Sequence, residues 1–172
     1  DIQQSDHNSI FVRYVFENAK LAVPDPIPIF STVTTSGRNQ FALGFDRIIS
    51  SNLLNAFRAG FDRHADLEDD TPVTSIPSNF GFVPGQPMGG IMIGASTGIN
   101  QSFSFAPIGS SRFVPRKYIQ DIFEYSDTLS YNRGTHAFKM GADVKRVRNN
   151  SSLASDTRGS FTFASLNSFL AG

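Results

Sequence analysis

The sequence predicts an all-β chain that folds as an antiparallel up-and-down meander of long hairpins. Two segments, 42–47 and 58–63, have nearly the same sequence and flank the polar turn at 50–52. In both segments aromatic and aliphatic side chains alternate with small or charged ones, which is the period of a β-strand and not of a helix. The composition agrees, because 17 Phe, 14 Gly and 9 Pro in 172 residues are typical of short strands separated by turns.

Three hairpins are predicted in order along the chain, at 1–18, 40–63 and 117–148. In the first, the end of a strand at 1–4 precedes a polar turn and a strand at 9–18. Each hairpin has one mainly apolar face, although Asp121 and Asp127 interrupt that face in the third. We therefore expect about six strands.

The two faces of the second hairpin leave two architectures open. One face carries Phe41, Leu43, Phe45, Phe57, Ala59 and Phe61, and the other carries Gln40, Ala42, Gly44, Asp46, Arg58, Gly60 and Asp62. A soluble sheet would bury the first face against a second layer. A transmembrane barrel would turn the first face to lipid and the second to an aqueous lumen.

Charge and composition exclude several other classes of protein. The 15 basic and 15 acidic residues give zero formal net charge, so we expect no nucleic-acid partner. The absence of Cys excludes a disulfide framework and a thiolate metal site. No apolar run reaches the roughly 18 residues of a transmembrane helix, whereas a membrane strand needs only about 9 to 11.

The connections between the hairpins favour the membrane architecture. Long loops are expected near 19–38, 64–116 and 149–159, whereas the turns within the hairpins are short. Structureless loops beyond about 12 to 15 residues are uncommon in compact soluble domains. Tight turns alternating with long loops are typical of outer-membrane barrels, and strands of about 10 residues span the apolar band of such barrels.

Five segments, in this order, resemble the barrel region of TonB-dependent outer-membrane transporters, most closely the Oar-like branch: NSIFVRY (8–14), NQFALG (39–44), NAFRAGFDR (55–63), DTLSYNRGTHAFKMGAD (127–143) and RGSFTF (158–163). The segment 80–100 resembles an extracellular loop of the same group. The chain shows no plug, TonB box or signal segment, and six strands are too few to close the roughly 22-stranded barrel that the resemblance implies. The whole of 1–172 is therefore expected to be a partial barrel segment.

The resemblance implies a location and a set of partners. The location is the outer membrane of a Gram-negative bacterium, where the parent protein would take up an unidentified substrate. Energy would come from the TonB complex, through parts of the parent that lie outside this chain. Outer-membrane lipid and lipopolysaccharide are the other expected partners.

Eight charged residues have the parity of the predicted lumen face: Arg13, Glu17, Asp46, Arg58, Asp62, Lys139, Asp143 and Lys145. Such residues either pair across neighbouring strands or line a path for a polar solute, and pairing is the preferred interpretation because each hairpin offers both signs. Arg47 and Arg63 have the apolar parity near predicted strand ends, which suits snorkelling to headgroups or lipopolysaccharide phosphates.

No other cluster predicts catalysis or a cofactor. The acidic segment 64–70 lacks the Gly and terminal Glu of an EF-hand, and the Gly-rich segment 85–94 lacks the Lys-Ser/Thr pair of a phosphate-binding loop and is expected to be loop. The three His are scattered, and no Gly-x-Ser-x-Gly elbow occurs. We therefore predict no enzyme, no catalytic residue, no cofactor and no metal. The remaining alternatives are a soluble β-sandwich that binds carbohydrate or protein and a surface or adhesion barrel without transport.

Overall fold

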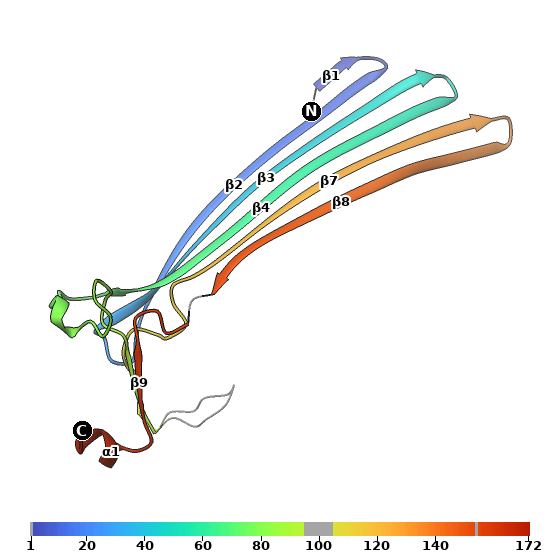
Figure 1. Cartoon of the computed structure of the whole chain (residues 1–172). Helices are drawn as coiled ribbons and strands as arrows, with labels where there is room; N and C mark the ends of the chain where they lie inside the picture. The colour runs from blue at the N-terminus through green and yellow to red at the C-terminus, as the bar shows by residue number, and fades with distance from the viewer. Residues whose placement is uncertain (1, 95–104, 154) are drawn as a thin grey trace. The chain divides into compact units, whose positions relative to one another are not determined.

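A six-stranded sheet dominates the computed structural model, which describes residues 2–94, 105–153 and 155–172 (Figure 1). The strand order is β1-β2-β3-β4-β7-β8, so each strand pairs with the next long strand along the chain. The bounds are Ile2–Ser5 for β1, Asn8–Pro24 for β2, Phe30–Ser50 for β3, Leu53–Pro72 for β4, Arg116–Arg133 for β7 and His136–Leu153 for β8. The predicted antiparallel meander of long hairpins is confirmed.

Short polar turns close the hairpins at 6–7, 51–52 and 134–135. At the last of these, Gly134 has φ +59°, a left-handed conformation that glycine adopts without a Cβ clash. Across the hairpins, the amide of Asn132 donates to the carbonyl of Asn52 at 2.9 Å, which links the β7 end to the β3–β4 turn.

The long strands extend further than the sequence analysis predicted, so the connections are shorter. The loops expected over 19–38 and 64–116 shrink to 25–29 and 73–115, and β8 continues through residues 149–153, which begin the third expected loop. Within the acidic end of β4, Glu68 pairs with Arg116 at 2.5 Å and Asp69 with Arg158 at 2.6 Å. Arg116 and Arg158 lie 48 and 89 residues away from their partners in the sequence. Without these distant partners, the acidic composition of the segment 64–70 indicated a loop.

The chain divides into two compact units. The first comprises 1–19, 36–65 and 118–150, and the second comprises 20–35, 66–117 and 151–172. The first unit holds the hairpin turns and the strand segments next to them. The second unit holds the long connections.

A second, three-stranded sheet forms within the second unit, in the order β6-β5-β9. Its strands are β5 (Gly90–Ile93), β6 (Ile108–Gly109) and β9 (Ser160–Phe163), and β5 pairs antiparallel with β6 but parallel with β9. The prediction of loop over 85–94 is therefore wrong at 90–93. Residues 95–100 of the segment likened to an extracellular loop, and residue 154 of the third expected loop, lie outside the described residues.

Close backbone approach explains the glycines beside β5. A Cβ on Gly89 would overlap the carbonyl oxygens of Gly159 and Arg158, and a Cβ on Gly109 would overlap the carbonyl oxygen of Gly89. Only glycine permits such contacts between neighbouring backbones. Some of the glycines that suggested a loop thus belong to a tightly packed sheet.

The second unit also contains two short helices. The 3-10 helix η1 spans Ser78–Phe80, and α1 spans Leu166–Leu170. Ser165 begins α1 with a capping box, because its hydroxyl accepts from the Ser168 amide while the Ser168 hydroxyl accepts from the Ser165 amide. Among the residues that the structure describes, no helix is long and apolar enough to cross a membrane.

Buried hydrophobic side chains are confined to the second unit in the described part of the chain: Phe30, Met92, Ile93 and Val114. In the first unit the apolar face stays open, and Phe16, Phe138 and Met140 are 58%, 55% and 64% exposed. Removing such side chains from water stabilises a fold by about 1.5 to 3 kcal/mol each. The first unit therefore leaves a large apolar surface for an external partner such as lipid.

Candidate functional site

The strands of the first unit present two chemically different faces. On the apolar face, the rings of Phe61 and Phe123 lie 5.0 Å apart between β4 and β7, and those of Tyr131 and Phe138 lie 6.5 Å apart between β7 and β8. Ring pairs of this kind join neighbouring strands. All four residues have the parity that the sequence assigned to the apolar face.

Ion pairs join neighbouring strands on the opposite, polar face. Both guanidinium Nη atoms of Arg58 donate to the carboxylate of Asp46, at 2.7 and 2.9 Å. Arg38 donates to Asp62 through Nη2 at 2.6 Å and Nε at 3.2 Å, and Lys145 pairs with Glu124 at 2.5 Å. The side chains are partly exposed, so water screens each pair and its contribution to stability is small.

The structure thus brings four of the eight candidate residues into ion pairs: Asp46, Arg58, Asp62 and Lys145. Their partners Arg38 and Glu124 were not among the candidates: Arg38 lay in an expected loop, and Glu124 lay in the third expected hairpin but was not singled out. Among the described residues, the other four candidates, Arg13, Glu17, Lys139 and Asp143, form no ion pair within 4.0 Å. Lys139 and Asp143 are exposed on β8, the last strand of the sheet.

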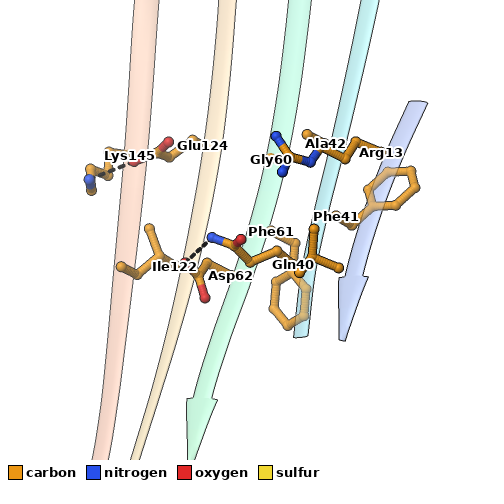
Figure 2. A pocket seen from close by; sticks show the side chains of 11 residues that line it. Arg13, Gln40, Phe41, Ala42, Gly60, Phe61, Asp62, Ile122, Glu124 and Lys145 are labelled. Atoms are coloured by element: carbon orange, nitrogen blue, oxygen red, sulfur yellow. Dashed lines mark hydrogen bonds and ion pairs between the residues drawn. The ribbon is translucent and has the colours of Figure 1, made fainter. Parts of the chain in front are cut away.

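A shallow hollow of about 430 Å³ lies on this polar face of the first unit (Figure 2). Figure 2 shows the Arg13 side chain beside Gly60 and Ala42, whose small size leaves the space open. Glu124 and Lys145 line the hollow, together with the Gln40 amide, which donates to Asp62 at 2.8 Å. The surface offers both signs of charge with polar amide groups, which suits contact with a polar solute.

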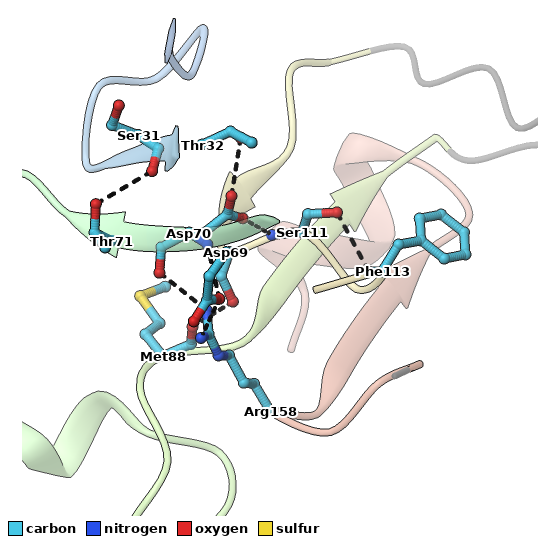
Figure 3. Close-up of polar contacts among 10 residues, drawn as sticks. Ser31, Thr32, Asp69, Asp70, Thr71, Met88, Ser111, Phe113 and Arg158 are labelled. Atoms are coloured by element: carbon cyan, nitrogen blue, oxygen red, sulfur yellow. Dashed lines mark hydrogen bonds and ion pairs between the residues drawn. The ribbon is translucent and has the colours of Figure 1, made fainter. Parts of the chain in front are cut away.

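A buried polar cluster organises the second unit (Figure 3). Asp70 is 2% exposed and accepts hydrogen bonds from the Thr32 hydroxyl at 2.9 Å and the Ser111 amide at 2.5 Å. Arg158, which is 7% exposed, donates to the Asp69 carboxylate at 2.6 Å and to the Asp70 carbonyl at 3.2 Å. The sequence analysis missed this cluster, because its members come from four distant segments and match no local motif.

Two carboxyl groups of the second unit have shifted pKa values. Burial and the neighbouring charge of Asp70 raise the pKa of Asp25 above its ordinary value. Burial also opposes ionisation of Asp156, but hydrogen bonds from Ser160 and Arg112 outweigh that effect and lower the pKa of Asp156. The Arg112 Nη2 donates to Asp156 at 2.7 Å.

Most of the acidic side chains in the segment 64–70 are bound to other segments of the chain. In the described ranges, no three His, Asp or Glu side chains gather in a way that could hold a metal ion. Glu68, Asp69 and Asp70 instead bind Arg116, Arg158 and the Thr32 hydroxyl, respectively.

The comparisons with known proteins agree with the exposed apolar face. The family model described as outer membrane beta barrel domain matches residues 1–172. No curated protein and no solved structure matches the chain. The match rules out the soluble β-sandwich interpretation, because it covers the whole chain. The chain belongs to the outer membrane beta barrel domain family and forms part of a transmembrane barrel in the outer membrane of Gram-negative bacteria.

Proposed function

We propose that the chain is a barrel segment of a TonB-dependent outer-membrane transporter of the Oar-like branch, which takes up a substrate that is not yet identified. The observation that carries this proposal is the division of the first unit into an exposed apolar face and a polar face with paired charges. The order of the five segments that resemble this transporter branch gives the finer assignment.

The orientation of the sheet follows from the cost of placing charge in lipid. A basic side chain on the lipid face of a barrel costs about 2 to 4 kcal/mol at the bilayer midplane. Arg58 and Lys145 would incur such costs if the polar face met hydrocarbon, and Asp46 would incur a smaller one. Phe61 and Phe123, in contrast, are favourable in hydrocarbon. The polar face, with all eight candidate residues, therefore faces the lumen in this proposal.

The strands are longer than the membrane requires. In the first unit alone, the β4 residues 53–65 extend roughly 43 Å at about 3.3 Å per residue, which is about 33 Å along the barrel axis for strands tilted by some 40°. The apolar band of such barrels is only about 25 Å tall. Because the hairpin turns are short, the excess belongs to the side of the long connections, which in this family faces the outside of the cell. Those connections are therefore suited to meet substrate first.

The proposed partners follow from this placement. Lipid and lipopolysaccharide would contact the apolar face, and the TonB complex would act through parts of the parent outside 1–172. The proposal includes no nucleic acid, no cofactor and no enzymatic step.

Binding to TonB tests the proposal. The full-length protein is purified from outer membranes in detergent, and the probe is the purified periplasmic domain of TonB. We expect saturable binding that a peptide of the TonB-box region from the same protein competes away. A barrel that serves only as a surface or adhesion protein would not bind this probe, and that result would overturn the transport assignment while leaving the barrel intact.

A further inference from the structure

A charged cluster interrupts the apolar face of the first unit. Asp121 of β7 lies between Arg63 of β4 and Arg148 of β8, with the guanidinium of Arg63 at 3.3 Å and that of Arg148 at 2.7 Å from the carboxylate. The Asp121 side chain is only 3% exposed, whereas those of Arg63 and Arg148 are 42% and 62% exposed. Arg63 was expected near a strand end, but it lies in the middle of β4.

The charge balance of this cluster differs from that of the polar face. There, each paired cation meets one carboxylate, whereas here two guanidinium groups share a single carboxylate and leave one net positive charge. Asp121 uses one Nη atom of each arginine, and a guanidinium has five N–H donors in a rigid fork. The buried carboxylate therefore positions two guanidinium groups whose remaining donors are accessible from outside.

The position of the cluster along the strands places it at one edge of the apolar band. Near the hairpin turn, the Asn55 amide donates to Asp127 on this same face at 2.6 Å. Between Asn55 and Arg63, the outward residues of β4 are Phe57, Ala59 and Phe61. Eight residues cover about 26 Å along the strand, or about 20 Å of height at a tilt near 40°.

Two polar rows, one formed by Asn55 and Asp127 and the other by Arg63, Asp121 and Arg148, thus bound an apolar stretch. This stretch is nearly as tall as the roughly 25 Å apolar band of outer-membrane barrels. Asn55 is the third residue of β4, so its row lies at the periplasmic edge. The Arg63–Asp121–Arg148 row lies at the opposite edge, at the level of the outer leaflet headgroups. In Gram-negative bacteria that leaflet presents the phosphate groups of lipopolysaccharide.

We propose that Arg63 and Arg148, held in place by Asp121, bind a lipid A phosphate of lipopolysaccharide on the outer wall of the barrel. Paired guanidinium groups form short, charge-assisted hydrogen bonds with phosphate oxygens, and basic pockets at membrane interfaces bind anionic headgroups. The site rests on the proposed orientation, in which the apolar face contacts lipid. It is independent of whether the parent transports a substrate.

Retention of lipopolysaccharide by the full-length protein tests the site. The protein is purified in mild detergent, incubated with bisphosphorylated lipid A, washed, and analysed for bound lipid A by mass spectrometry. We expect the double variant Arg63→Gln/Arg148→Gln to retain at least about fivefold less lipid A than the parent. The matched control is Arg58→Gln on the opposite face, which should retain as much as the parent.

Two further arms separate charge from fold and identify the ligand. The variant Arg63→Lys/Arg148→Lys keeps the two positive charges and should retain an intermediate amount of lipid A. The heat-dependent shift in gel mobility that folded barrels show confirms that each variant is folded. Dephosphorylated lipid A and phosphatidylglycerol replace the probe in parallel, and both should bind the parent more weakly. Equal binding of phosphatidylglycerol, or unchanged lipid A retention in a folded double Gln variant, would overturn the proposal.

An independent measurement checks the orientation. Single cysteines at Ala59 and Gly60, on opposite faces of β4, are labelled with a polarity-sensitive fluorophore in lipid vesicles. Emission typical of hydrocarbon at 59 and of water at 60 supports the orientation. The reverse pattern would refute both the orientation and the lipid A site, whereas a correct pattern with unchanged lipid A retention would refute the site alone.

Discussion

Leu43→Arg offers the sharpest test of which face meets lipid. Leu43 lies seven residues before the end of β3 at Ser50, which corresponds to about 23 Å along the strand and about 18 Å of height. The apolar stretch between the Asn55 and Arg63 rows, counted from Leu53 at the start of β4, runs from about 5 to about 25 Å of height. Leu43 therefore lies close to the middle of the bilayer.

At the midplane, an outward arginine should destabilise the barrel by about 2 to 4 kcal/mol, which shifts the unfolding equilibrium by roughly 30- to 1000-fold. The matched control is Ala42→Arg on the opposite face of β3, where the new cation meets Asp62 and Glu124 at the hollow. We expect that control to change stability by less than about 1 kcal/mol.

The assay is guanidinium unfolding of the full-length protein in lipid vesicles, with the folded fraction measured by heat-modified gel mobility. The milder variant Gly44→Ser on the polar face should also be tolerated, because its Cβ would press only on the flexible Arg58 side chain. If Leu43→Arg were as stable as Ala42→Arg, or more so, the assignment of the lipid face would be wrong.

Four further predictions concern the second unit of the full-length protein. Asp70→Ala should destabilise this unit by about 2 to 4 kcal/mol, since it leaves buried donors unpaired, and hydrogen exchange at 90–93 should rise without change in the hairpins. Gly89→Ala should open the small sheet and expose it to limited proteolysis, whereas Gly60→Ala, which has room for a Cβ, should not; equal cleavage would contradict the close approach at Gly89. Because the pKa of Asp156 is lowered, its stabilising effect should be complete above the ordinary value of 3.8 and lost as the pH falls through its lower folded value. The pKa of Asp25 is raised, so Asp25→Asn should stabilise the unit at neutral pH and the gain should vanish as the pH falls through that raised value; a gain that persisted at pH 3, measured by protease resistance, would contradict this.

The hairpins could be predicted from local sequence because the alternation of side chains and the polar turns are both short-range signals. The repeated segments 42–47 and 58–63 define the second hairpin, and the same parity places Phe61 and Phe123 on one face, where their rings meet. Within each strand, the residues that decide which side chains share a face lie within a few positions of one another.

Strand extension and the second sheet depend on distant partners, so local sequence could not predict them. Asp69 and Asp70 at the end of β4 favour a loop by composition. The distant residues Thr32, Ser111 and Arg158 make a buried strand end favourable there. The same holds for the polar face, where Asp62 was predicted as a candidate but Arg38 was hidden in an expected loop. The parity of a residue could be predicted, but its partner could not.

The parallel pairing of β5 with β9 has a consequence for how the protein is made. Between these two short strands, the chain runs through the whole β7–β8 hairpin, so β9 leaves the ribosome about 70 residues after β5. Pairs so distant in sequence form late, because the intervening loop must close first. The small sheet can therefore be completed only after the β7–β8 hairpin has been synthesised, and its closure ties together two chain segments that lie on either side of that hairpin in the sequence.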